Sequence, residues 1–356
     1  MRIMVDIGHP AHVHFFKNFV HEMEKRGHEF LVTARDKDVA LQLLKAYGIE
    51  HTVVGRIGKT KVGLISEWVR RDWKIYSIAK KFRPDVLTGI HNPCMAHVAR
   101  LIGAKSIIFT ETEHATIANL VTFPFSDVVC TPSCFKKDLG KKQLRYNGYH
   151  EIAYLHPKYF KPDDSVLDEL GLDENDRFTV IRFVSWGASH DIGQTGIDLA
   201  TKRKLVEEIR KHGRIFITSE SPLPEEFEKY RIVLSPEKLH DLLHYASLCI
   251  GEGGATATEA AILGTPSVLV ATWAQHCGTY DDLSAGHDLI STFSDPIPAF
   301  ARALELIRDL DTKKRWQEKR DNMLAGKIDV TEFMVNLVEQ YSKGAAETKK
   351  QVSFGQ

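Results

Sequence analysis

Short apolar runs alternate with longer amphipathic runs along most of the chain. An apolar run bounded by Gly, Pro or Asp predicts a strand, and apolar residues at every third or fourth position predict a helix. In the first half of the chain this pattern predicts helices that separate strands at 2–7, 29–34, 86–89, 105–110 and 127–131. Strands separated by helices are typical of a parallel sheet with helices on both faces, so we predict an α/β fold.

The alternation stops between residues 148 and 177, where prolines and the acidic run Asp173-Glu174-Asn175-Asp176 interrupt it. A second series follows, with strands predicted at 178–184, 214–218, 231–234, 247–250 and 266–271. Two series of similar length predict two Rossmann-like domains whose parallel sheets face each other across a ligand-binding cleft. We place the domains at 1–150 and 177–325, the linker at 151–176, a C-terminal helix packing back on the first domain at 326–345 and a disordered tail at 346–356.

Composition narrows the class of protein. The 47 basic and 47 acidic residues give a formal net charge of zero, so no global field attracts nucleic acid, and we expect no nucleic-acid partner. The five cysteines are scattered, and no Cys/His set completes a metal site, so we expect reduced thiols and no metal. The chain opens on a strand-like run and has no apolar run of membrane-spanning length, so we expect a cytoplasmic protein.

The segment from Gly251 to Pro266 carries the most specific chemistry, because it places a Gly-Gly turn between a strand and an Ala-rich helix. Glycines there let backbone N–H groups approach a ligand, and the helix N-terminus carries partial positive charge. Both features suit a phosphate or pyrophosphate. Glu259 lies about one turn into the helix, where its carboxylate is placed to accept hydrogen bonds from two ribose hydroxyls. An ordinary strand-to-helix turn with a surface glutamate is the alternative.

Three histidines, His9, His12 and His14, follow the first strand. Imidazole is the side chain best suited to proton transfer near neutral pH, and the end of a first Rossmann strand should face the cleft. We prefer His12 as general base on an acceptor hydroxyl or as an anion-binding group. We expect His9 to contact the acceptor and His14 to pack, with metal binding as the competing functional interpretation.

Further polar residues follow other predicted strands of the first domain. Glu111, Glu113 and His114 come after the strand at 105–110, and either glutamate is a candidate base. Surface solvation of at least one of them is the alternative. We assign contacts with the acceptor to Asn119 in the same stretch and to His91 and Asn92 after the strand at 86–89.

The second domain opens on an apolar strand that contains Arg182 and continues into a loop with Ser185 and His190. Hydroxyl and basic side chains after a strand are suited to a diphosphate. Arg182 also needs a polar partner, because it interrupts an apolar run. A structural loop with no ligand is the alternative.

Residues 56–85 are markedly basic, with nine positive charges against three negative and the aromatic residues Trp68, Trp73 and Tyr76 among them. An amphipathic surface that touches anionic lipid is one interpretation. An ordinary solvated helix with its tryptophans in the core is the other. Nucleic acid is less favoured, because no motif that binds it accompanies the basic residues.

The chain resembles the GT-B superfamily of nucleotide-sugar enzymes over roughly residues 1–340. It looks most like a family of archaeal and bacterial proteins known only as a domain of unknown function. It is also similar to the N-acetylglucosaminyltransferase of the lipid-linked peptidoglycan precursor and to the non-hydrolysing UDP-N-acetylglucosamine 2-epimerases. The resemblance rests on the motifs Ala11-His12-Val13, Ala79 to Leu87, Gly253 to Pro266 with Glu259, and Ala274-Gln275-His276.

Three departures bear on the chemistry. The loop after the first strand lacks the Arg-Pro-Glu of the epimerases, and His91-Asn92 stands where they carry an aspartate, so the epimerase interpretation is weakened. On the transferase side, Ala11 replaces the glycine before the loop histidine, so the acceptor chemistry is expected to differ.

The resemblance implies a metal-independent glycosyltransferase that moves a sugar from a UDP-sugar to a hydroxyl or lipid-linked acceptor in cell-envelope synthesis. The nucleotide-sugar is a substrate, so no cofactor is expected. The alternatives are a 2-epimerase and a non-catalytic subunit that binds nucleotide-sugars. The protein would be a monomer or homodimer, in the cytoplasm or peripheral on the inner face of the membrane. The implied donor residues are Arg182, Ser185, His190, Leu239, Gly253, Gly254, Thr256, Thr258, Glu259, Gln275 and His276.

Overall fold

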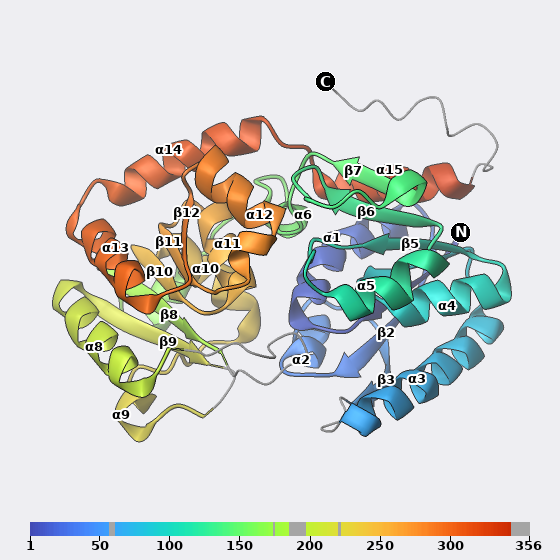
Figure 1. The fold of residues 1–356 in the computed structure, drawn as a ribbon, viewed down its shortest axis with the longest axis horizontal. Coiled ribbons are helices and arrows are strands. Elements are labelled where there is room, and N and C mark those ends of the chain that lie inside the picture. The colour runs from blue at the N-terminus through green and yellow to red at the C-terminus, as the bar shows by residue number, and fades with distance from the viewer. Residues whose placement is uncertain (57–60, 174, 185–196, 220–221, 343–356) are drawn as a thin grey trace.

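The computed structural model describes residues 1–56, 61–173, 175–184, 197–219 and 222–342. Two fully parallel sheets organise the chain, each at the centre of its own half of the molecule (Figure 1). The first sheet has the order β3-β2-β1-β4-β5-β6-β7. Its strands are β1 (Arg2–Ile7), β2 (Glu29–Asp36), β3 (His51–Arg56), β4 (Val86–Ile90), β5 (Lys105–Phe109), β6 (Val128–Pro132) and β7 (Gln143–Tyr146).

The second sheet has five strands in the order β12-β11-β10-β8-β9. They are β8 (Phe178–Phe183), β9 (Arg214–Ser219), β10 (Leu248–Gly251), β11 (Ser267–Val270) and β12 (Ile290–Phe293). The predicted α/β class with two parallel sheets is confirmed. The strand predicted at 231–234 is wrong, because only Arg231 forms a bridge, to Ile217, while Val233 is exposed.

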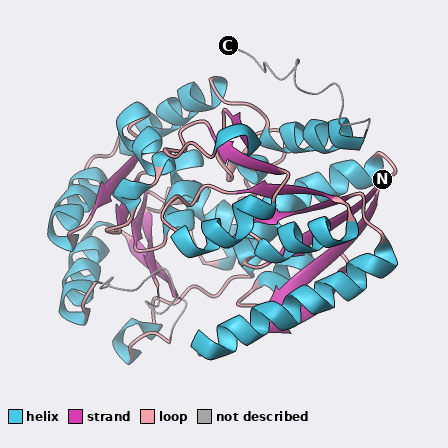
Figure 2. Ribbon diagram, turned by 45° about the vertical axis from the view of Figure 1, so that its right-hand side comes forward, coloured by secondary structure: helices cyan, strands magenta, loops and turns pink. Residues whose placement is uncertain are grey.

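Helices cover both faces of the first sheet (Figure 2). The alternation along β1 explains this, because Ile3 and Val5 join one buried cluster and Met4, between them, joins another. The cluster around Met4 belongs to α3 (Lys61–Phe82) and α4 (Pro93–Ile102), with α5 (Thr116–Thr122) next to α4. The opposite face carries α1 (Pro10–Lys25), α2 (Ala40–Ala46) and the last helix, α15 (Val330–Ser342).

Around the second sheet lie α8 (Leu199–Ile209), α9 (Glu225–Glu228), α10 (Leu239–Tyr245), α11 (Gly254–Ile262), α12 (Gly278–Asp281), α13 (Pro296–Arg308) and α14 (Thr312–Ala325). Two short helices, α6 (Ile152–Leu155) and α7 (Ser165–Glu169), occupy the segment between the sheets. After α14 the chain returns to the first domain, where α15 contacts α1 and α6. None of the helices in the described part of the chain is long and apolar enough to cross a membrane.

Two details were missed in the sequence. The sequence pattern predicts the first helix from about His14 to Arg26, but α1 begins at Pro10. The side chain of His9 caps it by accepting a hydrogen bond from Ala11 N, and a proline follows at the first helical position. Strands β3 and β7 were not predicted. Both are edge strands, whose polar residues weaken the apolar signal on which the prediction depends.

Candidate functional site

Helix α11 begins directly after β10, at a turn built from glycines. Gly253 is its N-cap, and a Cβ atom there would lie 2.7 Å from Cγ of Arg182. A Cβ atom at Gly254 would overlap the Trp273 ring and the Tyr280 hydroxyl. Only glycine therefore fits at these two positions. The N–H groups of the first helical turn have no partner within the helix, so this end of α11, beside a guanidinium group, is suited to an anion.

Arg182 extends to this end of α11 from the sheet of the second domain. It belongs to β8, and its Nη1 donates a 3.0 Å hydrogen bond to Oγ1 of Thr218 on β9. The neighbouring strand therefore supplies the polar partner that the sequence required of it. The predicted donor residues Ser185 and His190 lie outside the described residues.

Glu252 is a functional candidate that the sequence analysis missed. Its carboxylate is fully buried and accepts hydrogen bonds from the backbone N–H groups of Val184, at 3.3 Å, and Ile197, at 2.6 Å. The ammonium group of Lys202 lies 3.4 Å away. Glu252 thus binds Val184, which follows β8, and Ile197, which precedes α8, through one carboxylate. Its position inside the Gly251–Gly254 turn was the available signal.

Glu259, the predicted ribose ligand, lies at a junction between the two domains. Oε1 accepts a 2.8 Å hydrogen bond from the hydroxyl of Tyr154, on α6, and lies 3.1 Å from Nε2 of His240, on α10. The rings of Tyr154 and His240 both pack on His14 of α1, with centroids 5.3 and 4.5 Å away. Burial, followed by the nearby Glu259 carboxylate, raises the pKa of Tyr154 well above its usual range, so this phenol is a hydrogen-bond donor. Among the described residues, the hydrogen bonds of Glu259 go to Oε1, which leaves Oε2 for a ligand.

The other predicted donor residues fall into two groups. Thr256 and Thr258 are buried in α11, where Thr258 Oγ1 donates to the carbonyl oxygen four residues earlier, and Leu239 begins α10 next to His240. By contrast, the side chains of Gln275 and His276 are exposed on the turn after β11. That turn instead brings Trp273 to the start of α11.

His114, in the first domain, also lies beside Trp273 near the start of α11. Its ring stacks on that of Trp273, with centroids 5.5 Å apart, and its Nδ1 lies 3.3 Å from Sγ of Cys277. Burial and the adjacent Glu113 carboxylate raise the pKa of the Cys277 thiol, so it stays protonated at neutral pH. His114 therefore lies at the edge of the predicted diphosphate site.

His12 lies in the first turn of α1 with its ring 6.0 Å from that of His9. Burial, then electrostatic interaction with His9 and His150, holds the pKa of His12 well below its usual range, so its imidazole is neutral at pH 7. Nδ1 accepts a hydrogen bond from Gly8 N at 3.3 Å. A neutral imidazole that accepts at Nδ1 carries its proton on Nε2, so His12 presents a hydrogen-bond donor.

Glu113 links the two domains locally, and Asn119 bonds to its backbone. Oε1 of Glu113 accepts hydrogen bonds from the backbone N–H groups of Gly278, at 2.9 Å, and Lys136, at 3.1 Å. Asn119 Nδ2 donates to the carbonyl oxygen of Glu113 at 3.4 Å. Both side chains are buried, which favours a structural role over contact with a substrate.

Asn92 and His91, the remaining predicted acceptor residues, follow β4. Asn92 donates to the buried carboxylate of Asp6, and its Oδ1 caps α4 by accepting from Met95 N at 3.2 Å. Both ends of this amide are thus engaged within the first domain. The ring of His91 stacks on Phe123, with centroids 5.9 Å apart.

Glu111 lies beside two residues that the sequence analysis missed, His150 and Glu151. Oε1 of Glu111 is 3.4 Å from Nδ1 of His150. His150 and Glu151 are 5% and 4% exposed. In the described structure, Glu111 Oε2, His150 Nε2 and Glu151 Oε2 are buried without a hydrogen-bond partner. β7 was not recognised, and the sequence analysis placed His150 at the end of the first domain and Glu151 at the beginning of the linker.

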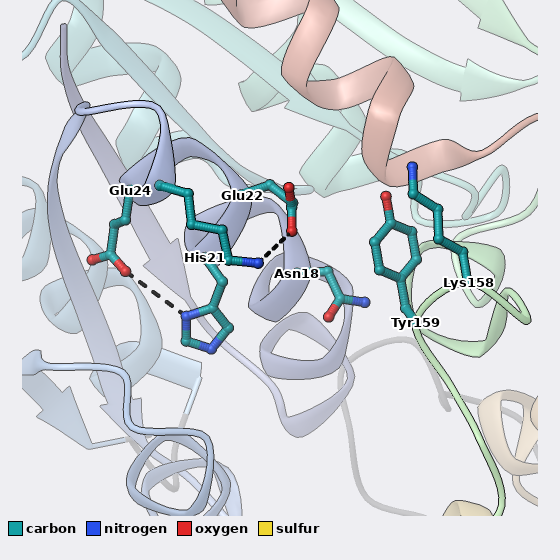
Figure 3. A pocket seen from close by; sticks show the side chains of 7 residues that line it. Asn18, His21, Glu22, Glu24, Lys158 and Tyr159 are labelled. Carbon is teal, nitrogen blue, oxygen red and sulfur yellow. Dashed lines mark hydrogen bonds and ion pairs between the residues drawn. The ribbon is translucent and has the colours of Figure 1, made fainter.

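A separate surface hollow of about 590 Å³ lies along α1 (Figure 3). It is lined by Asn18, His21, Glu22, Glu24, Lys25, Lys158 and Tyr159. Lys25 pairs with Glu22 at 2.8 Å, and His21 lies 3.8 Å from Glu24. None of the predicted site residues lines it.

Two parallel Rossmann-like sheets, each at the centre of its own half of the molecule, define the GT-B fold. The structure is similar to UDP-GlcNAc 2-epimerase from Neisseria meningitidis bound to UDP-GlcNAc, with a TM-score of 0.66 and 11% identity, covering 97% of this chain and 100% of that one. It is also similar to SsfS6, a glycosyltransferase from Streptomyces sp. SF2575, with a TM-score of 0.61 and 14% identity, covering 96% and 100%. At these identities the likeness establishes the fold, and the predicted GT-B resemblance is confirmed.

The chain belongs to the family described as "Protein of unknown function (DUF354)", which it matches over residues 1–343. It is also similar to the uncharacterized protein MJ0665 of Methanocaldococcus jannaschii. The two are 25% identical over 279 residues, which cover 75% of this chain and 80% of the relative.

Proposed function

We propose that the protein is a metal-independent glycosyltransferase that moves a sugar from a UDP-sugar to a hydroxyl, with a lipid-linked acceptor as the preferred class. The observation that carries the proposal is the N-terminus of α11, where Gly253 lies against Arg182, Gly254 lies against Trp273, and the Glu259 carboxylate follows about one turn later. Structures of the same fold include an epimerase bound to UDP-GlcNAc and a glycosyltransferase, which supports this class of donor.

In this proposal the diphosphate binds at the first turn of α11. The unpaired N–H groups, the helix dipole and the Arg182 guanidinium stabilise the negative charge that develops as UDP leaves, in the role that a metal ion has in other transferases. Glu259 accepts hydrogen bonds from the ribose through Oε2. The base lies against the backbone that leads into α10 at Leu239.

Two observations favour transfer over 2-epimerisation. Epimerisation needs groups that remove and return a proton at C2. The pair His91-Asn92 stands where the epimerases carry an aspartate; Asn92 has no titratable group, and its amide is engaged with Asp6 and the N-terminus of α4. His12 presents a proton on Nε2, which suits it to stabilise a substrate oxygen as a donor.

The surface formed by α3, α4 and α5 supports a lipid-linked acceptor. These helices cover the same face of the first sheet, and Trp73, Leu101, Ile117 and Leu120 on them are 69%, 70%, 73% and 72% exposed. The exposed basic residues of the same helices are Arg70, Lys74, Lys80, Lys81 and Arg100. Large apolar side chains among positive charges complement an anionic membrane surface. α5 starts just after His114, so this surface adjoins the proposed site.

The test incubates the protein with a panel of nucleotide-sugars, with and without a polyprenyl-phosphate-linked acceptor, and analyses the products by mass spectrometry and NMR. Release of UDP with a heavier acceptor is the expected result. An isomeric nucleotide-sugar formed without acceptor would establish the epimerase instead. UDP binding with no turnover under any condition would establish a non-catalytic subunit.

A further inference from the structure

The contact between Glu111 and His150 fixes which imidazole nitrogen carries the proton. Glu111 Oε1 lies 3.4 Å from His150 Nδ1, within the range of a loosely formed carboxylate–imidazole pair. A carboxylate beside Nδ1 favours a proton there, so Nε2 is the basic nitrogen of the neutral ring. In the described structure Nε2 is buried and has no hydrogen-bond partner.

This arrangement is the reverse of that at His12. There the backbone N–H of Gly8 points to Nδ1, so the proton lies on Nε2 and the ring donates. A general base needs an unprotonated nitrogen directed at the substrate. Of these two histidines, His150 therefore presents a base and His12 a donor.

The pair also lies next to the proposed donor site. His150 is followed by Glu151, the N-cap of α6, and α6 contacts α11 and carries Tyr154, the hydrogen-bond donor to Glu259. Tyr280, whose hydroxyl lies against Gly254, interacts electrostatically with Glu111. The Glu111–His150 pair thus has neighbours at Glu259, the proposed ribose ligand, and at Gly254, in the proposed diphosphate site.

We propose that His150, oriented by Glu111, is the general base that takes the proton of the acceptor hydroxyl; this rests on the proposed sugar transfer. The acceptor O–H proton moves to Nε2 as an oxygen lone pair forms the new bond to C1 of the sugar. The bond from C1 to the diphosphate oxygen breaks, and its electron pair leaves with UDP. The Glu111 carboxylate stabilises the imidazolium, which afterwards loses its proton to water.

Glu151 completes the surroundings of the pair. Burial and the like charge of Glu111 raise the pKa of Glu151 well above its usual range, which favours the neutral carboxyl form of Glu151. The other titratable groups that interact electrostatically with His150, Glu111 or Glu151 are His12, Cys134, Tyr146, Tyr149, Tyr154, Glu259, Cys277 and Tyr280.

The first experiment needs no substrate. Long-range 1H–15N NMR on protein labelled with 15N-histidine reports which ring nitrogen is protonated, with His150 and His12 assigned from the signals lost in His150→Gln and His12→Gln. At pH 7.5 we expect His150 to carry its proton on Nδ1 and His12 on Nε2. A proton on Nε2 of His150 would overturn the proposal whether or not a sugar donor is ever found.

The second experiment measures turnover. We expect His150→Gln to lower kcat about 10²- to 10⁴-fold, with UDP affinity within about twofold of the parent protein. Glu111 is a positioning residue, so Glu111→Gln should both lower kcat and move the acidic limb of the pH–rate profile to lower pH. His21→Gln is the matched control, because His21 also lies beside a glutamate, 3.8 Å from Glu24, but far along α1.

The outcomes separate the two proposals. Turnover by His150→Gln within a few-fold of the parent protein would exclude His150 as the base while leaving the transferase intact. A parent protein that turns over no nucleotide-sugar would exclude the transferase, and the tautomer measurement would still decide whether the pair exists.

Discussion

Tyr154, on the helix α6 that packs on α1 of the first domain, donates a 2.8 Å hydrogen bond to the Glu259 carboxylate of the second domain, and this bond is buried. The residue proposed to hold the ribose is therefore also a point at which the domains are joined. Binding of a nucleotide and the contact between the domains share one carboxylate. A ligand that uses Oε2 of Glu259 would bind to a group already positioned through Oε1.

We expect Glu259→Ala to weaken UDP binding about ten- to a hundredfold, because a buried acceptor for the ribose hydroxyls is lost. Tyr154→Phe should leave most of the affinity and lower the free energy of unfolding by about 1–3 kcal/mol, because a buried acceptor loses its donor. Calorimetry with UDP and urea denaturation measure the two effects. Tyr230→Phe is the control, since the described structure gives its hydroxyl no hydrogen bond. Unchanged UDP affinity in Glu259→Ala would rule out the ribose assignment.

Replacement of His12 distinguishes a donor from a base. We expect His12→Ala to lower kcat about 10²- to 10³-fold at saturating donor, as the loss of one preorganised donor does elsewhere. His12→Gln keeps an N–H donor, so it should retain more activity than the alanine variant. Equal losses in both variants, with UDP affinity unchanged, would return His12 to the role of base. Activity of His12→Ala within a few-fold of the parent would leave it a turn residue.

The sequence predicted the parts of the site whose residues lie in one contiguous segment of the chain. The glycine turn at Gly253 and the strand before it are a contiguous motif, so the donor half of the site was recognisable. The pairing of Glu111 with His150 joins residues from the ends of two different strands, and one of these, β7, is a short edge strand with a weak apolar pattern. Side-chain contacts of this kind depend on tertiary packing that periodicity does not encode.

The same distinction explains the acceptor half. Glu113 and Asn92 are polar residues at strand ends, which the sequence assigned to substrate chemistry. Their partners are backbone N–H groups and Asp6, and these contacts form only when distant segments meet. A polar residue at a strand end is equally suited to a structural hydrogen bond and to contact with a substrate, and only the folded structure distinguishes the two roles.

Glu252→Ala tests whether the segment after β8 is held for the donor. The substitution removes the acceptor for Val184 N and Ile197 N and leaves Lys202 without its carboxylate, so we expect a loss of about 2–4 kcal/mol in the free energy of unfolding. UDP affinity should fall as well. Glu252→Gln keeps one acceptor oxygen and should lose less. Stability equal to that of the parent would show that these hydrogen bonds are dispensable.

The exposed face of α5 tests the membrane proposal. We expect the parent protein to float with vesicles that contain anionic lipid and to remain unbound with zwitterionic vesicles. The double variant Ile117→Ser, Leu120→Ser should reduce flotation, because both side chains are exposed and lose apolar area without any change in charge. Substitution of the exposed Val233, on the second domain, serves as the control. If the double variant floats as well as the parent protein, α5 is not part of the membrane-binding surface.

Lys313 on α14 gives stability a defined dependence on pH. Its ammonium group donates to Oγ1 of Thr265 and to the carbonyl oxygen of His244, and burial lowers its pKa from 10.5 to about 7. In the unfolded chain the pKa is about 10.4, so between about pH 7 and about pH 10 the unfolded state binds more protons than the native state. The contribution of Lys313 to the free energy of unfolding should therefore rise with pH across this window. It should be lowest below pH 7, where Lys313 is protonated in both the native and the unfolded state.

Lys313→Met should abolish this contribution, because methionine fills a similar volume and does not titrate. Urea denaturation at pH 7, 8 and 9 would then give a smaller rise in the free energy of unfolding for Lys313→Met than for the parent. Lys314→Met, at the adjacent exposed position, should keep the slope of the parent. If the parent and Lys313→Met show the same slope, the ammonium group is solvated in the native state and its pKa is near the ordinary value.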